Sequence, residues 1–350
     1  MSLPSSAAGK SVSAVSRAIP QDRSLEVPGL IHFELTTRCP LHCPQCYNIT
    51  SHHKDLNFGL LTNYLQEAAR LKVLYIALSG GEPLVYPHLT ETILQIRALG
   101  MNSTMATSGC GLNEKRLQEL AKAGMGWLWI SLNGSTEEIH NKSRDKYDDA
   151  VRALELLQKT DLLYGINWVA RKDNAHDFPN LVDLAKKYGV KAINILRLKP
   201  DSHKQVPDLL DGPELADLAA YLKSYSNPAH AVYIETCFSV LRTLVHRDRY
   251  QGIEAGCAAG RQMMAVDVDG NFRPCRHLSF PEKGLSIANY WSQSDTINKL
   301  RSTEENVLDP CKSCGYLLNC RTCRATCANL YGDFNAGEKA CLVWQAKVAD

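Results

Sequence analysis

The sequence has no strong charge imbalance and no long apolar run. Its 39 lysines and arginines nearly balance its 37 aspartates and glutamates, so the formal net charge is only +2. This balance gives no reason to expect binding to nucleic acid or to a membrane surface. No stretch of about 18 apolar residues could form a transmembrane helix, and residues 1–27 lack the apolar run of a secretory signal. We therefore expect a cytoplasmic protein.

Wholesale disorder is excluded as well, because 45% of the 350 residues are hydrophobic and 22% are charged, close to the averages of globular proteins. Only residues 1–27, rich in serine, alanine and proline, predict a disordered tail. The length predicts two domains, or one large domain with an appendage. The sequence contains no internal repeat.

Cysteine, by contrast, is abundant. The chain has 13 cysteines, of which three lie between Cys39 and Cys46 and eight between Cys257 and Cys341. In an intracellular chain, clustered cysteines more often bind metal or act in catalysis than form disulfides. The odd total also argues against a fully paired disulfide set.

Short apolar runs alternate with amphipathic stretches from residue 31 to residue 196. The runs predict strands at 31–35, 73–78, 102–106, 127–132, 165–170 and 192–196, and helices lie near 60–71, 88–99, 113–123, 146–159, 177–188 and 213–225. This alternation predicts a parallel sheet with helices outside it. A closed barrel needs about eight such units, so six predict an open, three-quarter β6/α6 TIM-like barrel in an α/β protein.

The composition changes near residue 229, where cysteine, asparagine, arginine and glycine replace the periodic pattern. We therefore predict three parts: the tail at 1–27, the partial barrel at 28–228, and a cysteine-rich domain at 229–350. A short hairpin is expected in the last part, with its turn at Asp269–Gly270.

The first cysteine group directly follows the first predicted strand. Cys39, Cys43 and Cys46 have the spacing C-x3-C-x2-C, and three such thiolates can hold three irons of a [4Fe–4S] cluster while the fourth iron stays open. Structural zinc, the alternative, usually takes four protein ligands. No fourth cysteine is near, and the spacing of His42 is unsuitable. The pattern favours iron–sulfur over zinc.

On this motif the sequence resembles the radical SAM superfamily over roughly residues 28–228. Ser79, Gly80, Gly81 and Glu82, followed by Pro83, look like the motif that grips the methionine amine of S-adenosylmethionine (SAM) in that family. Glycines allow close backbone approach, and a carboxylate can pair with the ammonium group. Taken alone, the same residues are a plain strand-to-helix turn, but the cysteine motif before them favours the cofactor interpretation.

Further positions match the family less sharply. The resemblance implies that SAM is also contacted by Tyr47, Ser108, Ser131, Asn133, Arg144 and Leu196. Arg144 suits a carboxylate, although a solvated helix charge is the alternative, and Leu196 is equally compatible with the core. Two positions depart from the family: Gln45 replaces an aromatic residue before the third cysteine, and Asn133 replaces an aspartate.

The C-terminal cysteines resemble the SPASM domain of radical SAM peptide maturases. The pattern joins Cys257-x12-Gly270-x4-Cys275 to Cys311-x2-Cys314-x5-Cys320-x2-Cys323-x3-Cys327 and a final Cys341. Eight cysteines are more than a zinc ribbon usually needs. We therefore expect one or two auxiliary iron–sulfur clusters in this domain, with zinc as the alternative.

The ligand sets follow from the same resemblance. Cys311, Cys314, Cys320 and Cys341 would hold the far cluster, and Cys257, Cys275 and Cys323 would belong to the nearer one. The family's x3 gap is x2 here and Cys327 is extra, so the fourth ligand of the nearer cluster stays open between Cys323 and Cys327. Cys110 and Cys237 stand alone and are predicted to be buried, inert thiols.

The resemblance implies an enzyme that reductively cleaves SAM to a 5′-deoxyadenosyl radical and takes hydrogen from a substrate. A flavodoxin or ferredoxin would supply the electron. The favoured substrate is a ribosomally made peptide that becomes cross-linked or oxidised. The alternatives are a small molecule, such as a sugar or cofactor precursor, and a sulfatase-type formylglycine maturase. The maturases carry an acidic base where Arg276 stands here, which weakens that last hypothesis.

Arg276 and His277 are the predicted substrate-side residues, at the end of the hairpin. Arginine forms bidentate contacts with carboxylates and histidine exchanges protons near neutral pH, although both also suit a solvated hairpin. A peptide-recognition domain of about 80 residues, which many peptide maturases carry, does not fit before the first strand. We therefore expect a separate recognition protein or direct docking of the peptide.

Overall fold

One open sheet organises the computed structural model of the protein, which describes residues 24–48, 52–200, 203–227, 229–246, 256–339 and 341. Its strands are β1 (Leu30–Thr36), β2 (Tyr75–Gly80), β3 (Asn102–Thr107), β4 (Trp127–Ser131), β5 (Leu163–Ala170), β6 (Ala192–Arg197), β7 (Ala231–Ile234), β8 (Met263–Val266) and β9 (Phe272–Arg273). Their spatial order is β7-β6-β5-β4-β3-β2-β1-β8-β9. All neighbours are parallel except β8 and β9.

The predicted fold class is confirmed, and the sheet is wider than the six predicted strands. β7 pairs with β6 at one edge and β8 pairs with β1 at the other, and both follow residue 228. The predicted boundary at 228 therefore lies between strands of one sheet. The hairpin of β8 and β9 turns at Asp269–Gly270, where Gly270 has a φ of 78°.

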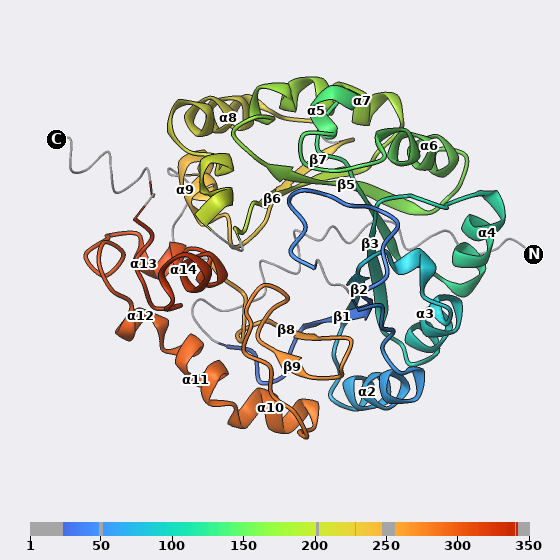
Figure 1. Cartoon of the computed structure of the whole chain (residues 1–350), viewed down its shortest axis with the longest axis horizontal. Coiled ribbons are helices and arrows are strands. Elements are labelled where there is room, and N and C mark those ends of the chain that lie inside the picture. Colours follow the sequence, from blue (N-terminus) through green and yellow to red (C-terminus); the bar gives the residue numbers. More distant parts are fainter. Residues whose placement is uncertain are drawn as a thin grey trace, which may run out of the picture.

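The predicted helices form the outer layer of the barrel. They are α2 (Phe58–Arg70), α3 (Leu89–Ala98), α4 (Glu114–Ala123), α6 (Tyr147–Leu157), α7 (Phe178–Lys187) and α8 (Gly212–Ser224). Figure 1 shows them around the outside of the strands. A short α5 (Glu137–His140) and α9 (Ser239–His246) were not predicted.

Alternation along β1 explains which side is core. Ile31, Phe33 and Leu35 are fully buried in the main hydrophobic cluster, whereas His32 and Glu34, between them, face the other side of the strand because side chains alternate. The second strand starts later than predicted: the Val73 N–H still bonds to Ala68 O of α2, at 3.0 Å, so β2 begins at Tyr75.

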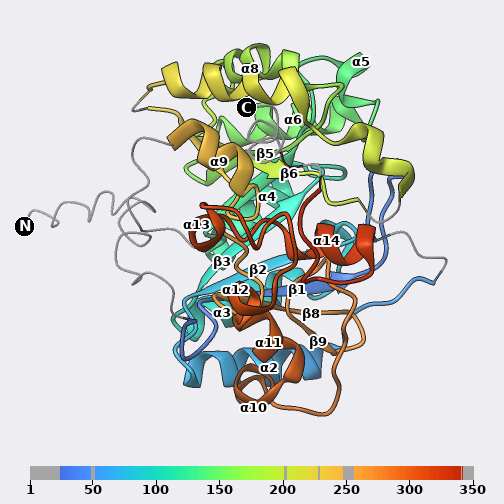
Figure 2. The same cartoon turned by 90° about the vertical axis from the view of Figure 1, so that its left-hand side faces the viewer.

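The C-terminal part contributes short helices: α10 (Ile287–Gln293), α11 (Asp295–Arg301), α12 (Thr303–Asn306), α13 (Leu317–Cys320) and α14 (Arg324–Tyr331). Figure 2 shows α11 to α14 in front of the strands, on one side of the barrel. Arg197, at the end of β6, joins the two parts, because its guanidinium donates to Glu338 at 2.6 Å and to Thr322 at 2.9 Å.

Residues 1–23 of the predicted disordered tail lie outside the described residues. Leu25, within the same predicted tail, is held by two hydrogen bonds: its N–H donates to Arg261 O and its carbonyl accepts from Trp291 Nε1, both at 2.9 Å. Across the described ranges, no helix has the length and the apolar character needed to cross a bilayer.

Candidate functional site

The loop after β1 carries the three cysteines of the first motif. The Cys46 N–H donates to Cys43 O at 3.0 Å, and the Asn48 N–H donates to Cys46 Sγ at 3.4 Å. Burial, together with the charges of the neighbouring Glu82, Cys43 and Cys46, raises the pKa of Cys39 to about 11. The three thiols are therefore close enough to interact, and binding a cation would favour their thiolate forms.

The spacing of these thiols bears on the kind of metal site. Among the described residues, no three side chains of histidine, cysteine, aspartate or glutamate converge on a position for a single metal ion. A four-iron cluster takes one thiolate on each iron, so its ligands need not converge on one point. Three thiols from one loop match the three protein ligands of a four-iron cluster with an open iron.

The glycines after β2 bring the second motif into backbone contact with the cysteine loop. A Cβ at Gly80, whose φ is 129°, would overlap the Thr36 carbonyl oxygen, and a Cβ at Gly81 would overlap that of Arg38. Without side chains, the Gly81 N–H reaches Thr36 O at 2.6 Å and the Glu82 N–H reaches Arg38 O at 2.8 Å. The two predicted cofactor motifs thus form one structural unit.

Glu82 is bound by four donors of the chain itself. Its Oε1 accepts from Leu84 N at 3.1 Å and Thr107 Oγ1 at 2.6 Å, while Oε2 accepts from Ser108 N at 2.7 Å and Ser108 Oγ at 2.5 Å. A carboxylate has about four acceptor positions, so an ammonium group would have to replace one of these donors. Burial raises the pKa of Glu82, and these hydrogen bonds oppose the rise.

Arg144 lies in the turn after α5 rather than on a solvated helix face. Its Nε is buried without a hydrogen-bond partner, and the same is true of Ser79 Oγ at the end of β2. The neighbouring Asp145 accepts the His42 N–H at 2.5 Å, inside the cysteine loop. Two unsatisfied polar groups beside the cysteine loop fit a bound cofactor that supplies their partners, because buried polar groups are normally paired.

Asn133 is fully buried and already bonded on both sides of its amide. Its Nδ2 donates to Ser143 Oγ at 2.7 Å, and its Oδ1 accepts from Val169 N at 3.1 Å. The side chain therefore ties the end of β4 to β5 and to the turn after α5. Ser131 ends β4 and is buried, and Leu196 near the end of β6 is half-buried; both stand at the carboxyl ends of their strands, as predicted.

The predicted substrate-side pair lies against Tyr47, the residue after the third cysteine. The Tyr47 and His277 rings are 4.3 Å apart, and Arg276 Nη1 donates to the Tyr47 hydroxyl at 3.3 Å. That hydroxyl donates to Glu34 Oε1 at 3.4 Å, and Arg273 forms an ion pair with the same carboxylate. The hairpin and the cysteine loop therefore share one polar wall.

His277 is held in its neutral form at this wall. Desolvation of the ring lowers its pKa well below the ordinary value of 6.5, and the positive charges of Lys199 and Arg276 lower it further. Burial also raises the pKa of Tyr47, to about 12. Neutral groups of this kind can donate or accept a hydrogen bond without carrying a charge into a desolvated site.

The cysteines of the C-terminal part fall into two sets. Cys257 and Cys323 are buried in one apolar cluster, with Cys275 packed against it. Cys320 lies near Cys311 and Cys341. Burial and the charges of these two thiols raise the pKa of Cys320 to about 12. Cys314 completes the second set through its N–H, which donates to Cys311 O at 3.1 Å. The roles of these two sets as ligands of a nearer and a far cluster stay predictions.

Cys237 was predicted to stand alone, and this is wrong. It is buried in the same cluster as Cys257 and Cys323, and its thiol is hydrogen-bonded to that of Cys323. Its distance of 20 residues from Cys257 matches no motif, so the spacing gave no signal. Cys110 was also predicted to be buried, but it is only partly buried, and its thiol lies beside Asp149.

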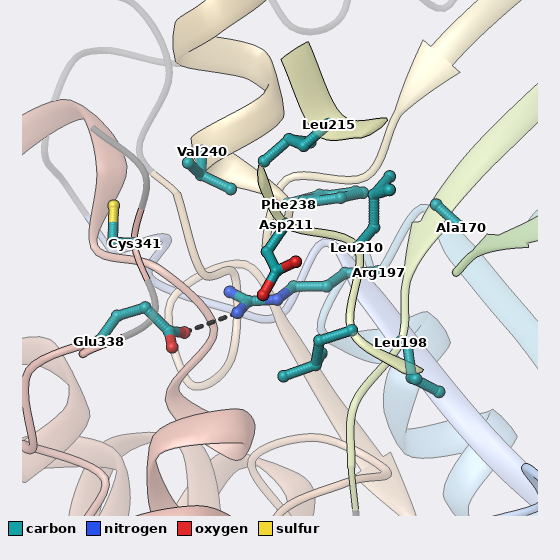
Figure 3. Close-up of a pocket in the computed structure, with 11 residues that line it drawn as sticks. Ala170, Arg197, Leu198, Leu210, Asp211, Leu215, Phe238, Val240, Glu338 and Cys341 are labelled. Atoms are coloured by element: carbon teal, nitrogen blue, oxygen red, sulfur yellow. Dashed lines mark hydrogen bonds and ion pairs between the residues drawn. The ribbon is translucent and has the colours of Figure 1, made fainter. Parts of the chain in front are cut away.

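A separate hollow lies between the end of β6 and the C-terminal part. Figure 3 shows the Arg197–Glu338 ion pair at its centre and Cys341 at its edge. Cys341 is the only predicted site residue that lines it. The hollow therefore lies beside the predicted far cluster and not at the cysteine loop of the barrel.

An open parallel barrel with three cysteines after its first strand, and a glycine loop packed on them, defines a class of iron–sulfur enzymes that bind SAM. Sequence comparison agrees: residues 33–185 match the radical SAM superfamily. The chain is 30% identical over 335 residues to the PqqA peptide cyclase of Methylorubrum extorquens (strain PA1), covering 88% of this chain and 83% of the relative. The chain belongs to the radical SAM superfamily and is an enzyme.

The chain is also similar to a heme synthase and to two solved structures. The AdoMet-dependent heme synthase of Methanosarcina barkeri is 25% identical over 339 residues, covering 90% of this chain and 96% of the relative. Among solved structures, Streptococcus suis SuiB bound to SAM has a TM-score of 0.74 at 18% identity, covering 91% and 78% of the two chains. The anSMEcpe structure with AdoMet and Cp18Cys peptide has a TM-score of 0.68 at 18% identity, covering 85% and 90%. These structures show that the fold is shared.

Proposed function

We propose that the protein cleaves SAM reductively at a [4Fe–4S] cluster held by Cys39, Cys43 and Cys46, and that it modifies a ribosomally made peptide. The observation that carries the first part is the backbone contact between the cysteine loop and the glycine loop, with Ser79 Oγ and Arg144 Nε buried and unpartnered nearby. When bound there, the cluster and SAM supply the 5′-deoxyadenosyl radical that takes hydrogen from the substrate.

The chain's own residues bind and orient SAM in this proposal. Ser79 and Arg144 donate to it, with Arg144 facing its carboxylate. Glycines 80 and 81 allow SAM to approach the backbone, while Glu82 positions Ser108 through two hydrogen bonds. Ser131, Asn133 and Leu196 form the strand-end wall around the nucleoside.

The hairpin end forms the substrate side of the proposed site. Arg276 is placed by Tyr47, and the neutral ring of His277 packs on the same tyrosine. A guanidinium suits a peptide carbonyl or carboxylate, and a neutral imidazole holds or moves a proton at Nδ1 or Nε2. The buried wall of Glu34, Arg273 and Tyr47 would exclude water from the radical.

A peptide substrate is supported by the PqqA peptide cyclases, which match over most of both chains, and by SuiB bound to its precursor peptide SuiA, which shares the fold. In the proposal, the auxiliary clusters of the C-terminal part carry electrons away from the product radical. A flavodoxin or ferredoxin reduces the enzyme, and the peptide docks directly or through a separate recognition protein.

A cofactor precursor is the second candidate substrate. The similarity to a heme synthase, which covers 96% of that relative, favours it. A sulfatase-type reaction has less support, because Arg276 occupies the position of the expected acidic base.

The test of the radical reaction uses anaerobically reconstituted protein with SAM and a low-potential reductant. We expect 5′-deoxyadenosine and methionine, and we expect none from the triple variant Cys39→Ala, Cys43→Ala, Cys46→Ala, because the open iron is lost. Cys110→Ala is the matched control and should cleave SAM like the parent. Undiminished cleavage by the triple variant would refute the cluster assignment.

The substrate class is then tested with deuterated candidates. One arm contains short peptides encoded by open reading frames beside the gene, and the other contains porphyrin precursors. Transfer of deuterium into 5′-deoxyadenosine from the peptide alone would support the peptide assignment, whereas transfer from a porphyrin precursor alone would overturn it.

A further inference from the structure

Four cysteines, and not three, gather at the nearer auxiliary position. They come from four separate segments: Cys237 lies between β7 and α9, Cys257 before β8, Cys275 after β9, and Cys323 at the start of α14. Cys237, Cys257 and Cys323 are buried in one cluster and Cys275 packs against it. Segments that are distant in sequence thus converge with a thiol each.

The contacts among these thiols are specific. Cys237 and Cys323 are hydrogen-bonded through their side chains. Cys275 lies near enough to Cys257 and Cys323 for their charges to affect it. Four thiols gathered at one position match the ligand count of a cubane or two-iron cluster, which takes four cysteines.

Cys327, which the spacing leaves open as a candidate for the fourth ligand, has different surroundings. It follows Cys323 by one helical turn, with its N–H donating to Cys323 O at 3.2 Å, and it is buried outside the cluster that holds the other four cysteines. Its pKa is affected by the charges of Arg324, Glu338, Cys323 and Arg197. The contact to Cys237 comes from Cys323, at the N-cap of α14.

The charges around the four thiols also fit an anionic cluster. Arg324 is buried beside Cys327, Cys311, Cys257 and Cys323. Its Nη1 donates to the carbonyl oxygens of Phe334 and Ala336, whereas its Nε and Nη2 have no hydrogen-bond partner among the described residues. Buried donors without partners are costly, and the thiolates of a nearby cluster would accept from them. Lys199 also lies beside Cys237 and Cys323, paired with Glu235 at 2.7 Å.

We propose that Cys237 is the fourth thiolate ligand of an iron–sulfur cluster whose other ligands are Cys257, Cys275 and Cys323, and that Cys327 is not a ligand of it. Each thiol loses its proton as it binds iron. This inference rests on the auxiliary clusters of the proposed function and adds the ligand that sequence spacing does not reveal.

The test measures iron, acid-labile sulfide and electron paramagnetic resonance (EPR) spectra, and no activity. The background is the triple alanine variant of the barrel cysteines, which should retain only auxiliary iron, about six to eight atoms per chain. Adding Cys237→Ala should remove the whole cluster, which is about four irons from a four-iron cluster or about two from a two-iron cluster. A four-iron cluster could also lose a single iron, which would leave a three-iron cluster with a paramagnetic oxidised form. Adding Cys327→Ala or the control Cys110→Ala should leave iron and spectra unchanged.

Full iron and an unchanged spectrum in the Cys237→Ala protein would overturn the proposal, as would an equal loss caused by Cys327→Ala. If Cys237→Ala does not fold, Cys237→Ser decides, because an oxygen ligand should shift the EPR spectrum of one cluster and a bystander serine should not. A triple variant without any iron would instead refute the auxiliary clusters of the proposed function themselves.

Discussion

The pH dependence of folding should report on His140, whose ring is buried in the turn that carries Arg144. Its Nδ1 accepts the Asn133 N–H at 3.2 Å, and its Nε2 lies 3.2 Å from the Asp145 carbonyl oxygen. These partners fit only the neutral ring with its proton on Nε2, because a proton on Nδ1 would face the Asn133 N–H. Burial lowers the pKa of His140 from 6.5 to about 4.

The sign of the effect follows from proton binding. Between pH 6.5 and about 4 the unfolded chain binds a proton at His140 and the folded chain does not, so the free energy of unfolding falls as the pH falls. At about 1.4 kcal/mol per pH unit, the full loss is about 3 kcal/mol, of which about 2 kcal/mol is already lost at about pH 5.

The assay is urea unfolding of the parent and of His140→Asn, under argon, at pH 7.5 and pH 5. Asparagine keeps an acceptor near the Nδ1 position but does not titrate. Between the two pH values, the free energy of unfolding of the variant should fall by about 2 kcal/mol less than that of the parent. This difference is expected even if the variant is less stable at both pH values. His88→Asn, which replaces an exposed histidine, should lose as much as the parent. Equal losses in the parent and in His140→Asn would refute the assignment of the depressed pKa.

Two further predictions concern the cofactor loop and the hairpin. Gly80→Ala should destabilise the fold by about 2 kcal/mol more than Gly100→Ala in the same urea assay, because both glycines have positive φ but only Gly80 would place its Cβ against a carbonyl, that of Thr36. Arg276→Ala with His277→Ala should reduce product formation more than threefold while SAM cleavage without substrate persists. A loss of product formation smaller than threefold, which corresponds to less than about 0.7 kcal/mol, would show that the hairpin is not part of the pocket.

The main strands and the motifs were predictable because their signals are local. Each parallel strand is a short apolar run, and the alternation with amphipathic helices fixes the fold class. The place of β8 beside β1 was not predicted, since four residues, Met263–Val266, carry little periodicity. Its place is set by a distant partner, with Leu30 opposite Met263, and no local pattern encodes that pairing.

Residue roles were less predictable than residue positions. The motif located Glu82 and Asn133 correctly at strand ends, but it did not reveal that their polar atoms are bonded within the chain to Thr107, Ser108, Ser143 and Val169. Cys237 was missed for the same reason. Hydrogen bonds and thiol contacts between distant segments depend on the packed structure, and spacing along the chain records only the local ones.

The bonded residues connect the predicted cofactor contacts to one another. Asp145 holds the cysteine loop at His42, and His140 holds the turn that carries Asp145. Glu82 in turn joins the glycine loop to Ser108. Because these hydrogen bonds join segments that would each touch SAM or the cluster, loss of one should loosen the others. The folded chain protonates His140 only as the pH approaches about 4. SAM titrations should therefore show a loss of affinity near pH 4 in the parent that is absent from His140→Asn, whereas the change in affinity between pH 7.5 and pH 5.5 should be the same in both proteins.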